Sequence, residues 1–441
     1  GNTMELLRFQ ENPTVRPLEQ TTVDSAAETA PSWLADLRQN GFQYFDKLSM
    51  PTGAEEEWRY VNLDFELTDF GVPDVAGIPL VSETDFSAVT DYAGIARLID
   101  GFVVDVFCDA PGVAFKHLAG NMDDADALLE ESIGQVVPAD VDIFGAAHRA
   151  FATDALVVHV GSGVVVDRPI VIDIQTTQAD TVSFPHLSVV MDANSEASFI
   201  VAMQSPDNER MVVVPQLELS VADGARLNLV TSQNWGDKTT AVTHQRMVLG
   251  RDSTGRLGEV GLGAKLGRLD LDVDLVGNGS SSELVGVYFG DREQVFDYRI
   301  VVNHHGKNTR SDVFLKGAVE DQAESVFTGL LKIWPDATRT STFETNRNLV
   351  LSDGAKAHSV PNLEILCDDV VCGHGSTVGP LEEEHMYYLM SRGLSKERAE
   401  RVLIRGFFDE MIQRMPVSGL EDQVRAAVTE KFVSAQVEGR V

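Results

Sequence analysis

Hydrophobic residues change their spacing twice along the chain. Before about residue 95 the spacing is helical, most clearly over 32–48, where a helix can begin next to Pro31 and must end before Pro51. Between about 95 and 365, short runs of Val, Ile and Leu of four to eight residues are separated by turn residues, which is typical of β-strands. Helical spacing returns after about 380. The pattern predicts a β core between two helical regions.

The segments that separate the predicted strands resemble one another. Small turn residues recur at 192–197, 222–225, 252–255, 277–280, 305–308 and 352–355, and their first positions lie 30, 30, 25, 28 and 47 residues apart. The longest interval has room for one more turn near 320–323. A repeat of about 25–30 residues is typical of a solenoid, in which each repeat adds one rung and only stacking buries the core. A large β-sandwich is the alternative that this spacing leaves open.

One C-terminal segment is apolar over an unusually wide arc. Ser395 can cap a helix that runs to about Met415, before Pro416. On a helical wheel its apolar residues cover more than one face: Ala399, Val402, Leu403, Ile404, Phe407, Phe408, Met411, Ile412 and Met415. Such a helix is either buried within its own bundle or docks a partner on its second face. Gly406, inside the helix, costs about 1 kcal/mol relative to Ala; close approach of a neighbouring backbone would explain it, and simple tolerance is the alternative.

Composition narrows the classes of function. The chain has 441 residues, 43% hydrophobic and 23% charged, which is ordinary for a globular protein and excludes wholesale disorder. No apolar run approaches the ~20 residues of a bilayer span, so we expect no membrane partner. With 68 acidic and 35 basic residues, the formal charge is −33. Such a surface repels phosphate, which argues against nucleic-acid binding, and we attribute the excess charge mainly to solubility.

The cysteines and the known catalytic motifs give further limits. Cys108, Cys367 and Cys372 are too few, and odd in number, for a disulfide framework, and they fit a reducing cytoplasm. No secretory signal is visible, so we expect a cytoplasmic protein. A phosphate-binding loop, a Gly-x-Ser-x-Gly elbow and a His-Glu-x-x-His motif are all missing from the sequence. No motif therefore assigns an enzymatic activity to the chain.

One segment carries candidate metal ligands. Residues i and i+2 of a strand point to the same side, so Cys372 and His374 would present a thiol and an imidazole on one face, about 6–7 Å apart. This pair suits iron, zinc or an iron–sulfur cluster. Two ligands do not complete a tetrahedral site, so the remainder must come from elsewhere, for example another subunit. The alternative is a small buried cysteine beside a hydrogen-bonded core histidine.

Other cysteine and histidine residues fit structural roles better. Strict strand alternation puts Cys367 on the opposite face from Cys372, and we interpret it as structural. His304 and His305 are adjacent and would point apart on a strand, so we interpret this pair as a turn entry or an interface without a metal role.

The sequence around this segment resembles the SufB/SufD family of iron–sulfur cluster assembly proteins, and more specifically looks SufD-like. The resemblance also covers 56–60, 169–170, 305–309, 326–329 and 346–352, and therefore most of the chain. Two positions depart from the family pattern: His148 stands where an asparagine is expected, and Pro380 follows the last turn. The most specific part of the resemblance is the run of Pro361-x-Leu363-Glu364-Ile365, Asp368-Asp369-Val370-x-Cys372-x-His374-Gly375-Ser376-Thr377-x-Gly379 and Tyr388-Leu389-x-Ser391-Arg392-Gly393-Leu394.

The resemblance implies a fold class and a set of partners. The fold would be mainly β: a right-handed parallel β-helix core (96–378) flanked by N-terminal (4–95) and C-terminal (379–441) α-helical regions. A SufB-like subunit would pair with the β-helix, and a SufC-type ATPase would bind the C-terminal region, where Leu403, Arg405, Gly406 and Phe407 are the candidate contacts. The chain would be a non-catalytic scaffold in the assembly of nascent iron–sulfur clusters, with ATP hydrolysed by the partner.

The resemblance also implies a role for the candidate ligands. His374, with Cys372 as its neighbour, would help to form a transient iron–sulfur cluster that is shared with the partner subunit. One alternative is a stand-alone homodimeric scaffold, because the edge of a β-helix invites self-pairing. Another is a β-helix enzyme that acts on acidic polysaccharide, which the strong negative charge and the missing secretory signal disfavour.

Overall fold

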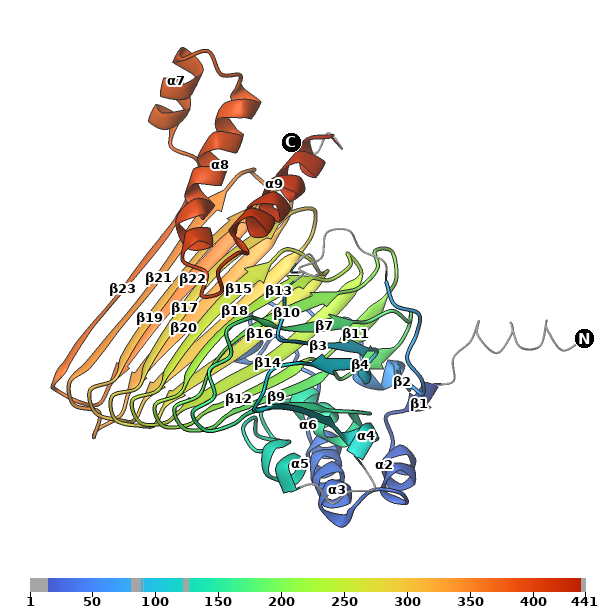
Figure 1. Ribbon diagram of the computed structural model, residues 1–441. Helices are drawn as coiled ribbons and strands as arrows, with labels where there is room; N and C mark the ends of the chain where they lie inside the picture. The colour runs from blue at the N-terminus through green and yellow to red at the C-terminus, as the bar shows by residue number, and fades with distance from the viewer. Residues whose placement is uncertain (1–14, 81–88, 90, 122–126, 438–441) are drawn as a thin grey trace, which may run out of the picture.

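The computed structural model describes residues 15–80, 89, 91–121 and 127–437, and it is dominated by a parallel β-solenoid of about eight turns (Figure 1). The chain is 43% strand and 22% helix, and the parallel pairing of successive rungs confirms the prediction of a β-helix core between terminal helices and excludes the β-sandwich. Within the described residues, no helix is both long enough and apolar enough to cross a membrane.

Two sheets form the solenoid, and each rung contributes one strand to the first sheet and one strand to the second. In the first sheet the strands lie in the order β4 (Phe102–Cys108), β3 (Gly94–Ile99), β7 (Ile170–Gln175), β10 (Glu196–Gln204), β13 (Arg226–Asn234), β15 (Thr254–Gly261), β17 (Ser281–Gly290), β19 (Arg310–Val319), β21 (Thr340–Val350) and β23 (Val370–Gly379). In the second sheet the order is β5 (Val113–His117), β6 (Leu156–Val160), β9 (His186–Met191), β12 (Gln216–Val221), β14 (Thr239–Leu249), β16 (Leu266–Leu275), β18 (Val295–His304), β20 (Glu324–Ile333) and β22 (Lys356–Ile365), with β8 (Val182–Ser183) and β11 (Met211–Val213) beside it.

Helices and short segments cover the outside of the two sheets. The N-terminal part contains β1 (Val15–Pro17), α2 (Gln20–Ala27), α3 (Ser32–Lys47), the 3₁₀ turns Glu56–Trp58 and Leu67–Asp69, and β2 (Gly71–Pro73). Between β5 and β6 lie α4 (Leu118–Asn121), α5 (Ala127–Ser132) and α6 (Ile143–Phe151). The C-terminal part contains α7 (Glu383–Ser391), α8 (Lys396–Gln413) and α9 (Glu421–Val437). In Figure 1, α7 projects beyond the solenoid, and it buries no residue.

The turns between rungs explain the repeat in the sequence. Asn194, Asp252 and Asn308 occupy left-handed backbone conformations (φ 61°, 53° and 55°), and Gly224 and Gly279 do so at the equivalent turns. Asn, Asp and Gly tolerate this conformation better than other residues do. The turns also stack: the Asn194 N–H donates to the carbonyl of the next turn, at Asp223, over 2.9 Å. The same turn chemistry therefore recurs wherever one rung passes to the next.

The interior of the solenoid changes character along its axis. Near β7 and β10 it is filled by aliphatic and aromatic side chains such as Ile170 and Phe199. Towards the C-terminal end, buried polar side chains face inwards from β18, β19 and β21: His304, Ser311, Thr342, Glu344, Asn346 and Asn348. These polar groups stay inside because most of them bond to one another, as the ring of His304 does to Thr309 Oγ1 (2.7 Å) and Ser311 Oγ (2.8 Å).

His304 makes the fold sensitive to acid. Burial lowers its pKa from 6.5 to about 4, so between these pH values the unfolded chain binds more protons than the folded chain does. Neutral His304 therefore leaves the free energy of unfolding at its full value above pH 6.5, and this free energy decreases as the pH falls towards 4. Between pH 7 and pH 5 we expect the native chain to lose about 2 kcal/mol more of its free energy of unfolding than His304→Asn does. Urea titrations at both pH values measure this, and equal losses would contradict it.

Candidate functional site

The C-terminal end of the solenoid is open. The last strands, β22 and β23, each hydrogen-bond to a neighbour on one side, β20 and β21 respectively. At the other end of the solenoid, an antiparallel strand closes the edge of each sheet: β4 pairs with β3, and β5 pairs with β6. An unpaired edge offers a row of free backbone N–H and C=O groups to another strand. Large apolar side chains are also exposed here: Phe343, Val360, Ile365, Leu366, Val371 and Val378. An edge of this kind is typical of a protein–protein interface.

The register of β23 puts the two candidate ligands on the inner face of the last rung. Cys372 pairs with Thr342 of β21, and His374 pairs with Glu344. Thr342 and Glu344 face the interior, and in-register parallel strands present paired side chains on the same face. Because no further rung in the described part of the chain covers β23, the side chain of His374 is exposed and that of Cys372 is half-buried. The pair thus lies side by side, as the spacing predicts.

Cys367 lies in the turn between β22 and β23, so strand alternation does not set its direction. It is buried against Ile333 and Ala337, and Cys372 packs against the same cluster. His304 and His305 point apart as expected: His304 is inside the solenoid, whereas the His305 ring stacks on Trp334 with 5.1 Å between ring centroids.

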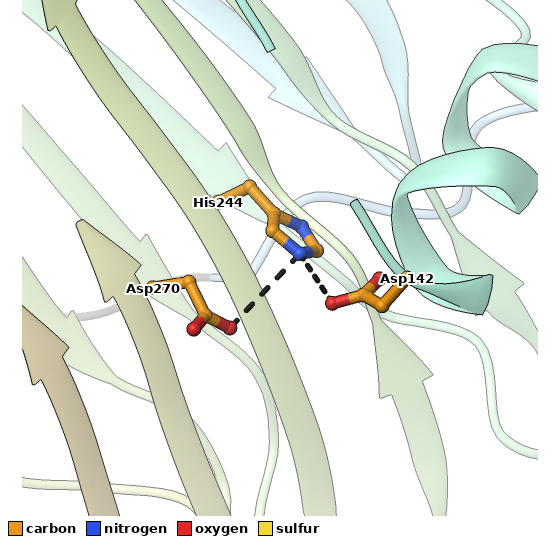
Figure 2. Close-up of side chains that lie close together, drawn as sticks. All are labelled: Asp142, His244 and Asp270. Atoms are coloured by element: carbon orange, nitrogen blue, oxygen red, sulfur yellow. Dashed lines mark hydrogen bonds and ion pairs between the residues drawn. The ribbon is translucent and has the colours of Figure 1, made fainter. Parts of the chain in front are cut away.

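Among the described residues, a group of three potential ligands within 4.8 Å of one another is found only at Asp142, His244 and Asp270 (Figure 2). His244 Nε2 donates to Asp142 Oδ2 over 2.8 Å and lies 4.0 Å from Asp270 Oδ2. Although burial lowers the pKa of His244, the Asp142 carboxylate outweighs it and raises that pKa. Likewise, burial would raise the pKa of Asp142, but His244 holds it below the usual value. The two side chains form a buried ion pair.

This cluster works as a clamp for the N-terminal segment. Asp142 caps α6 by accepting from the Gly145 N–H (2.8 Å). Arg268 donates to both carboxylate oxygens of Asp270 (3.0 and 3.1 Å), to Asp297 (2.7 Å) and to the carbonyl of Glu57 (2.6 Å). Trp58 lies over the Arg268 guanidinium, 3.6 Å from ring centroid to Cζ. Since Arg268 already occupies both oxygens of Asp270, the cluster is an ion network that holds the segment against β16 and not an open metal site.

A second buried network was not predicted from the sequence. His148 of α6 donates from Nδ1 to the Val214 carbonyl (2.9 Å) and accepts at Nε2 from His186 Nδ1 (3.0 Å). His186 Nε2 lies 3.3 Å from Glu218, whose carboxylate also accepts from the backbone N–H groups of Gly134, Val136 and Val137. The histidine that departs from the family pattern is therefore part of a network that fixes α6 and the loop before it. Its members come from separate segments, so no local spacing could reveal it.

The candidate partner contacts lie on α8, beside the end of β23. Leu403, Gly406 and Phe407 line a groove of about 680 Å³ together with residues 377–382 and with Arg347 of β21. Arg405 is exposed outside this groove. A Cβ built at Gly406 would meet no atom within 4 Å, so nothing among the described residues approaches this glycine closely. The apolar surface of α8 at Val402, which is 47% exposed, continues along the same groove.

The other face of α8 is anchored to the first sheet. Phe408, Met411 and Ile412 are buried against a cluster that includes Val285 and Val287 of β17. Lys316 of β19 donates to the Phe407 carbonyl (3.0 Å) and to Glu410 (2.9 Å). Lys431 of α9 bonds to the carbonyls of Leu262 and Phe289 and to Gln294 (2.6 Å). The helix thus has one face fixed to the solenoid and a second face towards the groove.

Comparisons with known proteins agree with this architecture. Residues 174–407 match the family model described as SUF system FeS cluster assembly, SufBD core domain. An iron–sulfur cluster assembly SufBD family protein of Mycobacterium leprae is 35% identical over 292 residues, which cover 64% of this chain and 74% of that protein. The iron–sulfur cluster assembly proteins SufD of Bacillus subtilis and Escherichia coli are 26% and 25% identical; their alignments cover 91% and 89% of this chain and 94% and 92% of those proteins.

Most of the solenoid therefore lies in the region that matches the core domain of SUF-type iron–sulfur cluster assembly proteins. This chain belongs to the SufB/SufD family.

The ion network around Arg268 gives a stability prediction. The Arg268 side chain is 2% exposed, so its removal takes from Asp297 its 2.7 Å ion-pair partner and leaves Asp270 with only His244, 4.0 Å away. We expect Arg268→Met to lower the free energy of unfolding by about 3–5 kcal/mol, measured by urea titration at pH 7. Arg256→Met is the control, because Arg256 is 41% exposed and 3.8 Å from Glu283, and we expect a loss of about 1 kcal/mol or less. Equal losses in the two variants would contradict the clamp.

Proposed function

We propose that the chain is a non-catalytic scaffold subunit in SUF iron–sulfur cluster assembly, and that clusters form at its open C-terminal end. The observation that carries the proposal is the exposed His374 on the inner face of β23, a ten-residue strand whose outer edge has no partner strand among the described residues. Membership of the SufB/SufD family supports the link to cluster assembly. The three cysteines are free thiols, which supports a reducing cytoplasm as the compartment.

A SufB-like subunit is the partner that we propose for the open end. A second β-helix could hydrogen-bond to β22 and β23 and cover the exposed apolar residues of both strands. It would also supply the missing ligands, since Cys372 and His374 alone do not form a closed set. The cluster would then be transient cargo, shared between the two subunits. A second copy of this chain could cover the same edges, and the oligomeric state with and without the partner separates the two cases.

A SufC-type ATPase is the partner that we propose for the groove along α8. The chain has no phosphate-binding motif of its own, so we assign ATP hydrolysis to that partner. Leu403, Gly406 and Phe407 offer an apolar face, and the uncrowded Gly406 allows close approach of another backbone. Lys316 links the Phe407 turn of α8 to β19, so movement of α8 would be transmitted to the rungs next to the open end.

His374 tests the scaffold role directly. We expect His374→Ala, co-expressed with the SufB-like and SufC-type subunits of the same organism, to lose most of the cluster that the native complex carries, because the imidazole supplies one ligand. Anaerobic purification and visible absorbance measure the cluster content. Ser376→Ala, on the same face of β23, is the matched control and should keep the native content. Native cluster content in His374→Ala would refute the ligand role.

Phe407 tests the docking surface. Phe407→Asp replaces the aromatic side chain of the groove with a carboxylate, and we expect ATPase binding to weaken by about 2 kcal/mol or more, as at an interface hot spot. Gln413→Asp makes the same change of charge at an exposed position of α8 outside the groove, and its binding should stay native. Isothermal titration calorimetry gives both affinities, and circular dichroism checks that α8 remains folded. Unchanged binding by a folded Phe407→Asp would exclude this surface.

A further inference from the structure

Towards its C-terminal end, from β17 to β22, the interior of the solenoid carries a polar network that is almost complete. Asn346 Nδ2 donates to Tyr288 Oη (3.0 Å), and Asn348 Nδ2 donates to Asn346 Oδ1 (2.8 Å). Tyr288 Oη donates to Asn348 Oδ1, and Ser359 Oγ of the opposite sheet donates to Asn346 Oδ1 (2.7 Å). These side chains satisfy one another, as buried polar groups are expected to do.

Glu344 stands apart from this network. Glu344 is only 1% exposed, yet neither of its carboxylate oxygens has a hydrogen bond of normal geometry among the described residues. Burial raises its pKa to about 8, and the backbone N–H of Asn362 offsets that rise only in part. The side chain crosses the interior to the second sheet, where a Cβ built at Gly329 would lie 2.3 Å from Glu344 Oε2. Glycine at this position leaves the space that the carboxylate occupies.

The register makes Glu344 and the candidate ligand neighbours on one face, while the carboxylate itself reaches across the interior towards Gly329. Glu344 and His374 are paired residues of β21 and β23, and adjacent strands lie about 4.8 Å apart. On the inner faces of β20, β21, β22 and β23, Glu344 is the one carboxylate and His374 the one imidazole. A buried carboxylate is costly unless a proton or a cation neutralises it. Carboxylate and imidazole together are the ligand types that non-haem Fe(II) sites use.

We propose that Glu344 and His374 together bind a divalent transition-metal ion of the ferrous class at the open end of the solenoid. The inference rests on the proposed function and deepens it, because it names mononuclear iron as a cargo that this chain holds before any cluster forms. Water completes the coordination of the ion in the isolated chain, and the partner subunit replaces that water in the complex. Glu344 lies one rung below the exposed edge, so the ion is held inside the end of the solenoid and not on its outer surface.

The test uses the full chain on its own and Co²⁺ as the probe, followed by calorimetry and visible absorbance, with anaerobic Fe²⁺ as the competitor. We expect saturable binding at one site. Glu344→Gln and His374→Ala should each weaken it about tenfold or more, since even groups that only support metal ligands contribute 10–100-fold. Glu364→Gln is the matched control, because Glu364 is on the outer face of β22 beside Lys332, and its affinity should be native.

Each outcome decides between the two proposals. Native Co²⁺ affinity in Glu344→Gln, or no saturable binding by the native chain, would overturn the metal pair even if His374→Ala still abolished cluster formation in the complex. Native cluster formation by His374→Ala would instead remove the proposed function. If Glu344→Gln did not fold, Glu344→Asp would replace it, because it keeps the charge on a shorter side chain. His374→Ala changes an exposed position and would still test the pair. Native Co²⁺ affinity in His374→Ala would exclude the pair.

Discussion

A solenoid buries apolar side chains only where one rung covers the next, and this constraint shapes the whole molecule. Each strand from β7 to β21 and from β6 to β20 has a neighbour on both sides, so its backbone groups are bonded and its inner face is covered. The stack must stop somewhere, and at its C-terminal end it stops without a covering element within the described residues. The exposure of Cys372 and His374 follows directly from that missing cover.

The outer faces follow a different logic, because they are covered by segments distant in the sequence. The N-terminal segment is held on the second sheet by ionic contacts around Arg268 and by the stacking of Trp58 on Phe144, with 5.6 Å between ring centroids. The helices α8 and α9 are held on the first sheet by aromatic packing and by two buried lysines, Lys316 and Lys431. The N-terminal segment reaches the outer face of β22, where Tyr60 stacks on His358 with 4.3 Å between ring centroids. Among the described residues, neither covering pairs with the outer edges of β22 and β23, so these edges stay accessible to a partner.

The sequence was sufficient to predict the repeat and the placement of Cys372 and His374 on one face, because both are local. Asn, Asp and Gly mark each turn, and the i, i+2 spacing of Cys372 and His374 does not depend on the rest of the fold. Glu344 could not be found in this way. Thr340, Thr342, Glu344, Asn346 and Asn348 alternate along β21, and alternating polar residues normally indicate the solvent side of a strand. Here they face inwards, and only the register of the assembled sheets reveals it.

The regular register also determines how the molecule tolerates changes in length. Glu196 pairs with Arg226 and Ser281 pairs with Arg310, so consecutive rungs repeat after 30 and 29 residues with the same strand and turn chemistry. Deletion of one such unit from the middle would shorten the stack by one strand spacing in each sheet. It would also remove the contacts of that rung with the outer coverings, such as those of Arg268 with Glu57 or of Val285 with α8. Solenoid length can therefore change only in whole rungs, and each change must be matched in the segments that cover the outer faces.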